Sequence, residues 1–342
     1  ERGQCMKFLI TGGAGYIGST VVSALEDAGH TPVILDSLTT GRVEFTRGKI
    51  FYQGDIADPL LLRQIFSDHP DIYAVLHCAA LIVVPESVEK PYEYYRENVA
   101  KSNEMFHILN ELGCKRIVFS SSAAIYDKVD NFMVTEDSPL APNSPYARTK
   151  FIMEMVLQDT CKAYGMKGIA LRYFNPIGAD PKYRSGIHVK EPSHVLGKLV
   201  DTALGKQDYF MITGVNWPTR DGSGIRDYIH VWDLAAAHLK ALTEFDLAFE
   251  RAGNPEDNYL VINLGSGHGI TVIELVEAFE RVFGHTINKK VAEPRAGDVA
   301  GAYANADRAK KLLGWQSELS IDDGIRSALE WGKVRENILH YD

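Results

Sequence analysis

The sequence predicts an α/β protein in which a doubly wound parallel sheet is joined to a smaller domain of mixed α/β structure. Two observations lead to this prediction. Short apolar runs recur along the first half of the chain, and a helical stretch of roughly 10–20 residues follows nearly every run. Strands that alternate with helices pair in parallel, and right-handed crossovers place the helices on both faces of the sheet.

The first apolar run, KFLIT at 7–11, is suited to a buried parallel strand. The helix after it is expected to end near Ala28, because Gly29 can take the left-handed C-cap conformation. The other predicted elements are strands at 31–36, 50–55, 72–80, 116–122 and 167–173, and helices that end near 67, span about 91–112 and carry Lys150.

The chain's 342 residues fit two packed domains better than one. Gly, Pro and polar residues become frequent through 175–225, where the alternation of strands and helices ends. We therefore predict a first domain over residues 6–175 and a second domain mainly over 176–342. The run YLVINLG at 259–265 is predicted to be a buried strand that can return to the first sheet. Later returns near 225–265 would make the second domain discontinuous.

Composition argues against several classes of function. The net charge of −9 argues against nucleic acid as a partner. No apolar run approaches the ~18 residues that a membrane helix needs, and the longest ends at Pro85. Neither cysteines nor histidines show the spacing of metal ligands, so no metal is expected. The cysteines predict free thiols in a reducing, cytoplasmic compartment: Cys5, Cys78, Cys114 and Cys161.

The segment TGGAGYIG at 11–18 contains Gly13-x-Gly15-x-x-Gly18 directly after a predicted strand and at the start of a helix. Its small residues allow a tight turn and let a pyrophosphate approach the helix N-terminus. Asp36, at the end of the second strand, is suited to bond a ribose diol, and no arginine adjoins it to receive a 2′-phosphate. The pattern favours a Rossmann-type fold that binds NAD rather than NADP. A glycine-rich turn without a ligand is the alternative.

Other polar and small residues also follow predicted strands. Ligands of open parallel sheets lie beyond the carboxyl ends of the strands. Asp36, Asp55, Cys78–Ala80 and Ser120–Ser122 all fall at such ends. Each alone could cap a loop, but together they predict one edge of one site.

Tyr146 and Lys150 stand four residues apart after Ser144-Pro145, so on a helix they share a face. They could simply flank a solvated helix start. Beside a dinucleotide, the amine could instead keep the phenol partly ionised as a base. That chemistry near pH 7 requires the phenol pKa to fall from ~10 by about three units, or roughly 4 kcal/mol. A cation at ~4 Å contributes about that much only at an effective dielectric of ~20, so the amine must be shielded from solvent.

Three motifs resemble the extended short-chain dehydrogenase/reductase family: TGGAGYIG, SSSA at 120–123 and YARTK at 146–150. Three further segments are similar to the UDP-glucose (UDP-galactose) 4-epimerases of that family: RYFNPIGA at 172–179, PTRDGSGIRDYIHVWDLA at 218–235 and EPRAGD at 293–298. The likeness runs from about residue 6 to residue 335. The Tyr-x-x-x-Lys pattern is shared by the broad family, whereas the RDYIHV and RAGD segments are far more specific.

The resemblance implies a role for each matching residue. Tyr146 would be the catalytic base, Lys150 would tune it and hold the nicotinamide ribose, and Ser122 would bond the sugar 4-hydroxyl. The cofactor NAD would be lined by Gly12, Gly15, Tyr16, Ile17, Gly18, Asp36, Asp55, Ile56, Cys78, Ala79, Asn98, Lys150 and Tyr173. The substrate would be held by Ser122, Tyr146, Asn175, His194, Arg226, Tyr228, Arg295 and Asp298.

The implied reaction is NAD-dependent inversion of C4 of a UDP-hexose through a 4-keto intermediate, which interconverts UDP-glucose and UDP-galactose. One alternative is an epimerase of UDP-N-acetylhexosamines or UDP-pentoses. Another is a nucleotide-sugar 4,6-dehydratase, but its Asp-Glu pair is replaced here by Ser-Ala at 122–123. A sensor that binds NAD without catalysis is a third. The resemblance also implies that the first domain binds NAD and that the second domain binds the substrate. It further implies a homodimer that forms through two helices of the first domain.

Five positions depart from the family pattern. A lysine near the nicotinamide matches Ile82, and a glycine matches Asp127. An asparagine at the substrate phosphates is His194, which is still a donor, and an aromatic residue over the uracil aligns with Thr213. A bulky residue that gates N-acetyl sugars in some relatives aligns with Ala302, whose small side chain predicts that UDP-N-acetylhexosamines are accepted too.

Overall fold

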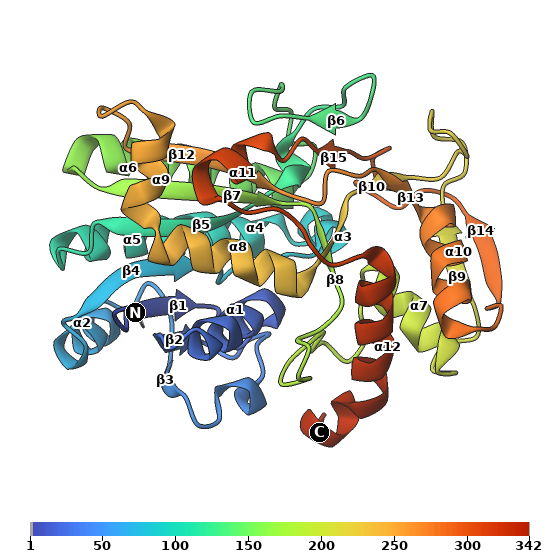
Figure 1. The fold of residues 1–342 in the computed structure, drawn as a ribbon, viewed down its shortest axis with the longest axis horizontal. Coiled ribbons are helices and arrows are strands. Elements are labelled where there is room, and N and C mark those ends of the chain that lie inside the picture. The colour runs from blue at the N-terminus through green and yellow to red at the C-terminus, as the bar shows by residue number, and fades with distance from the viewer. Residues whose placement is uncertain (1–2, 342) are drawn as a thin grey trace.

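The computed structural model, which describes residues 3–341, contains one central sheet of seven parallel strands (Figure 1). The strand order is β12-β7-β5-β4-β1-β2-β3, so the chain winds outward from β1 in both directions. This order is that of a doubly wound, Rossmann-type sheet, and it confirms the predicted fold class. The strands are β1 (Lys7–Thr11), β2 (Thr31–Asp36), β3 (Ile50–Gln53), β4 (Ile72–His77), β5 (Arg116–Ser122), β7 (Lys167–Tyr173) and β12 (Tyr259–Leu264).

Helices cover both faces of the sheet, because the apolar side chains of a parallel sheet are buried on both sides. Figure 1 shows α1 and α8 side by side along one face. The helices on that face are α1 (Tyr16–Asp27), α8 (Val231–Thr243), α9 (Phe245–Ala252) and α11 (Asp307–Leu313). The helices on the other face are α2 (Pro59–Asp68), α5 (Lys101–Glu111) and α6 (Pro145–Tyr164).

The helix predicted over 91–112 begins at Pro91 as expected, but it is not one regular α-helix. A helix α3 (Val84–Glu89) precedes it, and α4 (Pro91–Tyr94) starts anew at the proline. Proline lacks the N–H that a continuous helix would use, so it favours the first position of a new one. A π-helical segment, Tyr95–Ala100, then leads into α5. Such segments often mark functional sites, and this one carries Asn98.

Two strands are shorter than predicted. β3 ends at Gln53 and β4 ends at His77. Asp55 and Cys78 therefore lie in the loops just past these ends, where ligands of parallel sheets bind.

A second set of elements packs around its own apolar core at one end of the sheet (Figure 1). Its core includes Leu199, Phe279 and Ile325. The elements are α7 (Val195–Ala203), β9 (Phe210–Thr213), α10 (Val272–Phe283), β14 (Lys289–Ala292) and α12 (Ile321–Ile338). Short strands form further pairs, namely β6 (Met133–Val134) with β15 (Tyr303–Ala304), β8 (Asn175–Ile177) with β11 (Tyr228–His230), and β10 (Ile225–Arg226) with β13 (Ile270–Thr271). Two short 3₁₀ turns span Val43–Thr46 and Ala123–Ile125.

The chain leaves the central sheet after β7 and returns to it only at β12. The two strands pair in parallel from Gly168 and Tyr259 to Tyr173 and Leu264. Helices α7 and α8 and strand β9 lie between β7 and β12 in the sequence. The edge strand of the sheet is therefore supplied from late in the chain.

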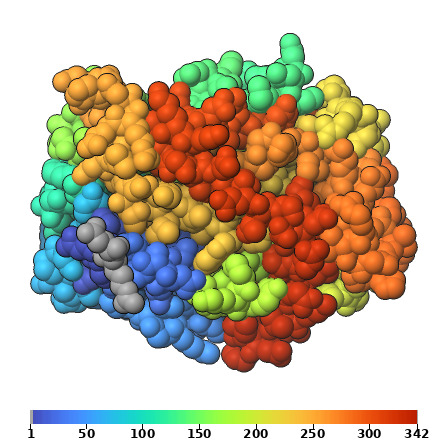
Figure 2. Space-filling model, viewed as in Figure 1, coloured from blue at the N-terminus to red at the C-terminus, as the bar shows by residue number. Residues whose placement is uncertain are grey.

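The space-filling view shows how the sets of elements meet (Figure 2). The yellow-green surface near residues 180–190 lies between the blue N-terminal part and the red C-terminal helix. Arg184 anchors this segment through ion pairs with Asp27 and Asp180, and Trp331 of α12 donates a hydrogen bond to the carbonyl of Ile187 at 2.9 Å. Within residues 3–341, we find no helix whose length and apolar character would let it cross a membrane.

Candidate active site

The glycine loop between β1 and α1 packs its backbone too closely for side chains at two positions. Gly12 has φ of 71°, and a Cβ on it would lie 2.8 Å from the backbone nitrogen of Ala79. A Cβ on Gly18 would overlap the carbonyl oxygen of Gly12. No side chain caps the N-terminus of α1, whose N-cap is Gly15. The N–H groups of this first turn, which includes Ile17, are therefore available to a diphosphate.

Asp36 ends β2 beside that loop and is only 8% exposed. One carboxylate oxygen accepts a hydrogen bond from the backbone of Ala14 at 3.0 Å, and the other accepts from Leu38 at 2.8 Å. Burial raises the pKa of Asp36, and these two backbone hydrogen bonds oppose the rise. Since each carboxylate oxygen has two lone pairs, each keeps one for a ligand hydroxyl. The predicted ribose contact therefore fits this geometry.

The side chains of Asn98 and Asp55 already form hydrogen bonds or ion pairs within the protein. The Asn98 amide accepts from the backbone N–H of Leu81 at 2.8 Å and donates to its carbonyl at 2.9 Å. It also donates to the hydroxyl of Thr149 at 3.1 Å. Asp55, whose neighbour Ile56 is buried, forms an ion pair with Lys101 at 2.5 Å. In this structure Asn98 fixes the loop after β4 instead of offering its amide to a ligand.

Thr11, which the sequence reading did not single out, joins β1 to the loop after β4. Its hydroxyl accepts hydrogen bonds from the backbone nitrogens of Cys78 at 3.1 Å and Ala79 at 3.2 Å. It also contacts Nδ1 of His77 at 2.6 Å, and Nε2 of that ring contacts the hydroxyl of Ser102 at 2.8 Å. A threonine that closes an apolar strand is the only sequence signal for this role.

Two tyrosines predicted to line the cofactor are anchored by hydrogen bonds to distant elements. Tyr16 donates to the carbonyl of Gly178 at 2.6 Å. Tyr173, at the end of β7, bonds through its hydroxyl to Nε2 of His238, whose Nδ1 contacts the carbonyl of Leu234 at 2.7 Å. Burial raises the pKa of both phenols, so they stay neutral and act as fixed walls.

The start of α6 presents Tyr146 and Lys150 toward the end of β5. Ser144 caps the helix by accepting a hydrogen bond from the backbone of Ala147 at 3.1 Å, and Pro145 occupies the first turn. Lys150 is 2% exposed, and its Nζ donates to the carbonyl of Ser120 at 2.9 Å. Nζ lies 5.9 Å from the centre of the Tyr146 ring. The amine is therefore enclosed, as its predicted role requires.

The pKa values differ from the sequence-based expectation. Burial lowers the pKa of Lys150 to about 8, although Cys78 and Glu154 oppose the shift. Burial raises the pKa of Tyr146 above its ordinary value, and a hydrogen bond with Ser122 opposes the rise. Lys150 was expected to lower the pKa of Tyr146, but desolvation of the phenol dominates because the amine bonds to Ser120. A positive charge brought by a ligand would be needed to ionise the phenol.

The segment IRDY turns two neighbouring side chains toward the opposite part of the cleft. Along an extended chain residues i and i+2 share a face, so Arg226 and Tyr228 point one way and Asp227 the other. Asp227 is fully buried and accepts hydrogen bonds from the backbone nitrogens of Ser266 at 2.7 Å and Ala304 at 3.0 Å. Asp227 was not predicted, although its place between two site residues is a signal that could have found it.

Arg226 and Tyr228 have polar groups without partners. The Arg226 guanidinium donates three hydrogen bonds, to the carbonyls of Ile225 at 2.8 Å, Ala300 at 2.9 Å and Val299 at 3.2 Å. Within residues 3–341 no carboxylate lies within 4.0 Å of it, and burial lowers its pKa. The Tyr228 hydroxyl is buried without a hydrogen-bond partner among the same residues. A half-buried arginine without a carboxylate partner and a buried hydroxyl without a hydrogen-bond partner are suited to an anionic ligand that carries acceptors.

The other predicted substrate residues are placed unevenly. Arg295 and Asp298 pair with each other at 3.4 Å instead of standing free. Asn175, at the start of β8, is exposed. His194 accepts a hydrogen bond from the backbone of Gly197 at 3.0 Å and so caps α7. That bond uses Nδ1, which leaves Nε2–H as the donor that a phosphate could use.

The positions that depart from the family pattern lie in different surroundings. Ile82 is 61% exposed, in the loop that Asn98 fixes. Thr213 is half-buried at the end of β9, and the Asp127 backbone donates to the carbonyl of Pro139 at 2.8 Å. Ala302 packs against an apolar cluster of Tyr126, Val134, Phe174 and Ala304.

Comparison with known proteins supports the resemblance that the sequence motifs indicate. The model of the NAD dependent epimerase/dehydratase family matches residues 8–256, which is more than half of the chain. The chain belongs to this family. It is 41% identical over 332 residues to the UDP-glucose 4-epimerase of Azospirillum brasilense, covering 96% of this chain and 93% of that relative. The resemblance seen in the motifs is therefore confirmed over nearly the whole length.

Solved structures of other NAD dependent epimerase/dehydratase relatives have the same fold. The UDP-glucose 4-epimerase of Bifidobacterium longum in complex with NAD⁺ and UDP superimposes with a TM-score of 0.89 at 33% identity, covering 98% of this chain and 100% of that one. The UDP-Glc/GlcNAc 4-epimerase of Campylobacter jejuni gives a TM-score of 0.79 at 34% identity, covering 96% and 99%.

Proposed function

We propose that this chain catalyses the NAD-dependent inversion of C4 of a UDP-hexose and so interconverts UDP-glucose and UDP-galactose. The observation that supports this most directly is the enclosed group of Tyr146, Lys150 and Ser122 at the end of β5. It lies at the carboxyl ends of the sheet, where the glycine loop and Asp36 leave space for a dinucleotide. Relatives that carry this name match nearly the whole chain.

The residues of the first domain would hold the cofactor and the reacting carbon. The glycine loop would receive the diphosphate of NAD, and Asp36 would bond a ribose hydroxyl. NAD, when bound, accepts a hydride from C4 of the hexose and later returns it. Tyr146 takes the proton of the 4-hydroxyl as C4 is oxidised, and Ser122 hydrogen-bonds to the oxygen of that hydroxyl. Tyr146 must be a phenolate to take this proton, and it becomes a neutral phenol; Lys150 contributes the positive charge that stabilises the phenolate before the transfer.

The residues of the second set of elements would hold the nucleotide diphosphate. Arg226 and Arg295 would bond the phosphates, and Tyr228 would give its unsatisfied hydroxyl a partner. Asn175 and Asp298 would complete the nucleotide site. A firm grip on the diphosphate and a loose one on the sugar lets the 4-keto sugar turn about its tether. Tyr146 then returns the proton after the opposite face has been reduced, which inverts C4.

The decisive test is a product assay with UDP-galactose and no added NAD. Formation of UDP-glucose is the expected result, because the cofactor regenerates in each turnover. A 4-keto-6-deoxy sugar as the product would instead identify a 4,6-dehydratase. If no product forms, the alternative of a sensor that binds NAD without catalysis is favoured. The Tyr146→Phe variant is the matched control for contaminating activity.

We further propose that the enzyme accepts UDP-N-acetylhexosamines. Ala302 is small where a larger side chain would occupy space near Tyr126 and Phe174. Turnover of UDP-N-acetylglucosamine beside UDP-glucose tests this, and Ala302→Tyr is expected to lose the first activity while keeping the second. No turnover of the N-acetyl sugar by the unmodified enzyme would contradict the proposal. UDP-pentoses in the same assay would test the remaining alternative.

We also propose the division of labour and the setting of the enzyme. Residues 6–175, with later returns near 225–265, would bind NAD, and residues 176–342 would mainly bind the nucleotide sugar; residue 342 lies outside the described part. A homodimer through two helices of the first domain is expected, and analytical ultracentrifugation would test it. The free thiols of Cys114 and Cys161, both buried, support a reducing cytoplasmic setting.

A further inference from the structure

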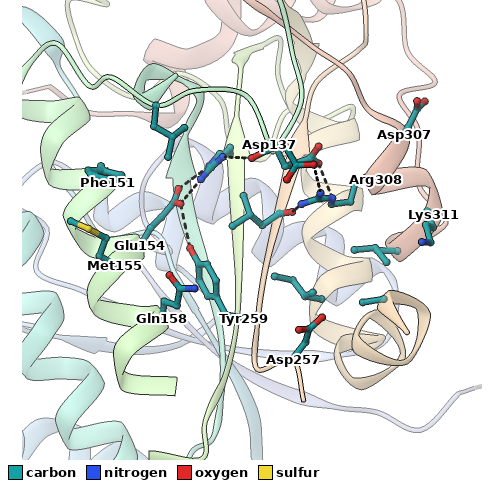
Figure 3. A pocket seen from close by; sticks show the side chains of 17 residues that line it. Asp137, Phe151, Glu154, Met155, Gln158, Asp257, Tyr259, Asp307, Arg308 and Lys311 are labelled. Atoms are coloured by element: carbon teal, nitrogen blue, oxygen red, sulfur yellow. Dashed lines mark hydrogen bonds and ion pairs between the residues drawn. The ribbon is translucent and has the colours of Figure 1, made fainter. Parts of the chain in front are cut away.

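Behind the catalytic residues, a buried carboxylate on α6 is held by three neighbouring strands. Glu154 is 5% exposed and accepts two hydrogen bonds from Arg172 of β7, at 2.7 and 3.0 Å. It also accepts from the hydroxyl of Tyr259 on β12 at 3.3 Å, and from the hydroxyl of Ser121 on β5. Glu154 lines a cavity of about 630 Å³. Figure 3 shows it in this cavity, with a dashed line to Tyr259.

Ser121 lies between the two residues of β5 that contact the catalytic pair. The carbonyl of Ser120 accepts from Lys150, and Ser122 lies close enough to Tyr146 to lower the pKa of its phenol. Glu154 stands one helical turn after Lys150, so α6 contacts three consecutive residues of β5. The bond between Glu154 and Ser121 is the one of the three that touches no reacting group.

The end of β5 needs this support because it lacks a strand on one side. β5 pairs with β4 only as far as Phe119, whereas its pairing with β7 continues to Ser122. Ser120, Ser121 and Ser122 therefore extend beyond β4, with ladder hydrogen bonds to a single neighbour. Through Glu154 of α6, the side chain of Ser121 is tied to Arg172, its partner residue on β7, which adds a restraint to this singly paired segment.

We propose that Glu154 is a positioning residue for the reaction: anchored by Arg172, it fixes Ser121 and thereby the end of β5 that aligns Ser122 and the Ser120 carbonyl with Tyr146 and Lys150. This inference rests on the proposed function. A displacement of ~1 Å in a catalytic group can cost ~100-fold in rate, so a modest shift of this strand end is measurable.

The charge of Glu154 has a second effect, on Lys150. Its carboxylate favours the protonated amine, which burial disfavours. Loss of that charge lowers the pKa of Lys150, so the amine loses its proton at a lower pH. The titratable and charged groups that face Lys150 are His77, Cys78, Tyr146 and Glu154. Those that face Glu154 are Arg172, Tyr259, Tyr126 and Lys150.

Two variants and one control test the proposal on the full-length enzyme with bound NAD. Ser121→Ala removes only a hydroxyl and leaves the ion pair intact, so it tests the coupling without loss of the fold. We expect its kcat to fall ~10-fold while KM for UDP-galactose and NAD content change less than twofold. Glu154→Gln should lower kcat at least as much and also move the alkaline limb of the kcat profile ~0.5 unit toward lower pH.

Glu136→Gln is the matched control. Glu136 lines the same cavity and is also a buried carboxylate, which accepts from the backbone of Asn263 at 3.0 Å and lies near Arg308. Within residues 3–341 its carboxylate forms no hydrogen bond to β5, so the kcat and pH profile of the Glu136→Gln variant should stay unchanged even if the melting temperature falls.

Two results would overturn the proposal. If Ser121→Ala keeps kcat within twofold, the bond to Glu154 does not align the site. If Glu154→Gln lowers only the melting temperature, as the control does, the carboxylate is merely structural. An unmodified enzyme that converts no UDP sugar would refute the proposed function itself. If the unmodified enzyme is active and both variants keep its kcat, only the positioning role of Glu154 is refuted.

Discussion

The two sides of the cleft differ in how far the protein satisfies its own polar groups. On the cofactor side, Asp36 accepts two backbone hydrogen bonds and the Asn98 amide makes three bonds. On the substrate side, Arg226 has no carboxylate partner and the Tyr228 hydroxyl is buried without one, among the residues that the structure describes. The side chains of Asp36 and Asn98 thus have partners within the protein, whereas the Tyr228 hydroxyl has none among the described residues.

This difference matches what each side has to do in the proposed reaction. A preformed site loses little ordering entropy on binding, so it suits a cofactor that stays through turnover. A buried unsatisfied group costs about 1–3 kcal/mol, and a ligand that bonds it recovers that free energy. Part of the affinity of the substrate side for the nucleotide would therefore come from polar groups that have no partner before the nucleotide binds.

The largest expected effect is at Tyr146, where the two sides meet. Tyr146→Phe should lower kcat at least ~100-fold, because the variant lacks the hydroxyl that is proposed to take the proton of the 4-hydroxyl. NAD content after gel filtration should stay near that of the unmodified enzyme. Near-normal turnover of UDP-galactose would remove Tyr146 from its assigned role and, with it, the meeting point of the two sides.

A second prediction tests the unsatisfied side. Arg226→Gln removes the half-buried positive charge and should raise KM for UDP-galactose ~30-fold, since hydrogen bonds to charged groups contribute about 1.5–3 kcal/mol. NAD content should not change. Arg220→Gln is the control, because Arg220 is already paired with Glu274 and is exposed. Equal effects from the two variants would show that Arg226 contributes only general charge.

A third prediction tests the satisfied side. Asp36→Asn keeps the shape of the side chain but places an amide N–H against Ala14 or Leu38, both of which donate. We expect retention of NAD to weaken ~10-fold, with KM for the UDP sugar unchanged. The measurement is the NAD content of acid extracts after dialysis. A rise in KM without loss of NAD would contradict the separation of the two sides.

The smallest effect is also the most diagnostic. Tyr228→Phe removes a buried hydroxyl that has no partner, so the enzyme without a nucleotide should be as stable as before or more stable by up to ~1 kcal/mol. Binding of UDP should weaken ~5-fold. Calorimetry with and without UDP measures both changes. A loss of stability without the nucleotide would mean that the hydroxyl is already satisfied and that the contrast between the sides is false.

The sequence located the proposed catalytic group because its pattern is local. Tyr146 and Lys150 lie four residues apart after a Ser-Pro, and that spacing alone places both side chains on one face of a helix. The ends of apolar runs likewise placed Asp36 and Ser122 at the edge of the sheet. Such features depend on a few neighbouring residues, so they survive without knowledge of the fold.

The remaining features depend on contacts between distant segments. Asp227 meets Ser266 and Ala304, and Glu154 meets Arg172, and no local pattern specifies those pairings. The rise that burial causes in the pKa of Tyr146 could not be predicted for a similar reason. Its desolvation is set by the packing of the whole cleft, which a count of residues between a phenol and an amine does not contain.

The late return of the chain at β12 has a consequence for biosynthesis. While the polypeptide is still growing on the ribosome, β7 is finished at Tyr173 but its outer neighbour is not made until residues 259–264. Throughout that interval β7 is an open edge with unpaired backbone groups, which other nascent chains can join. Premature termination anywhere between these strands should therefore yield insoluble fragments, and slow translation of residues 174–258 should increase the demand for chaperones.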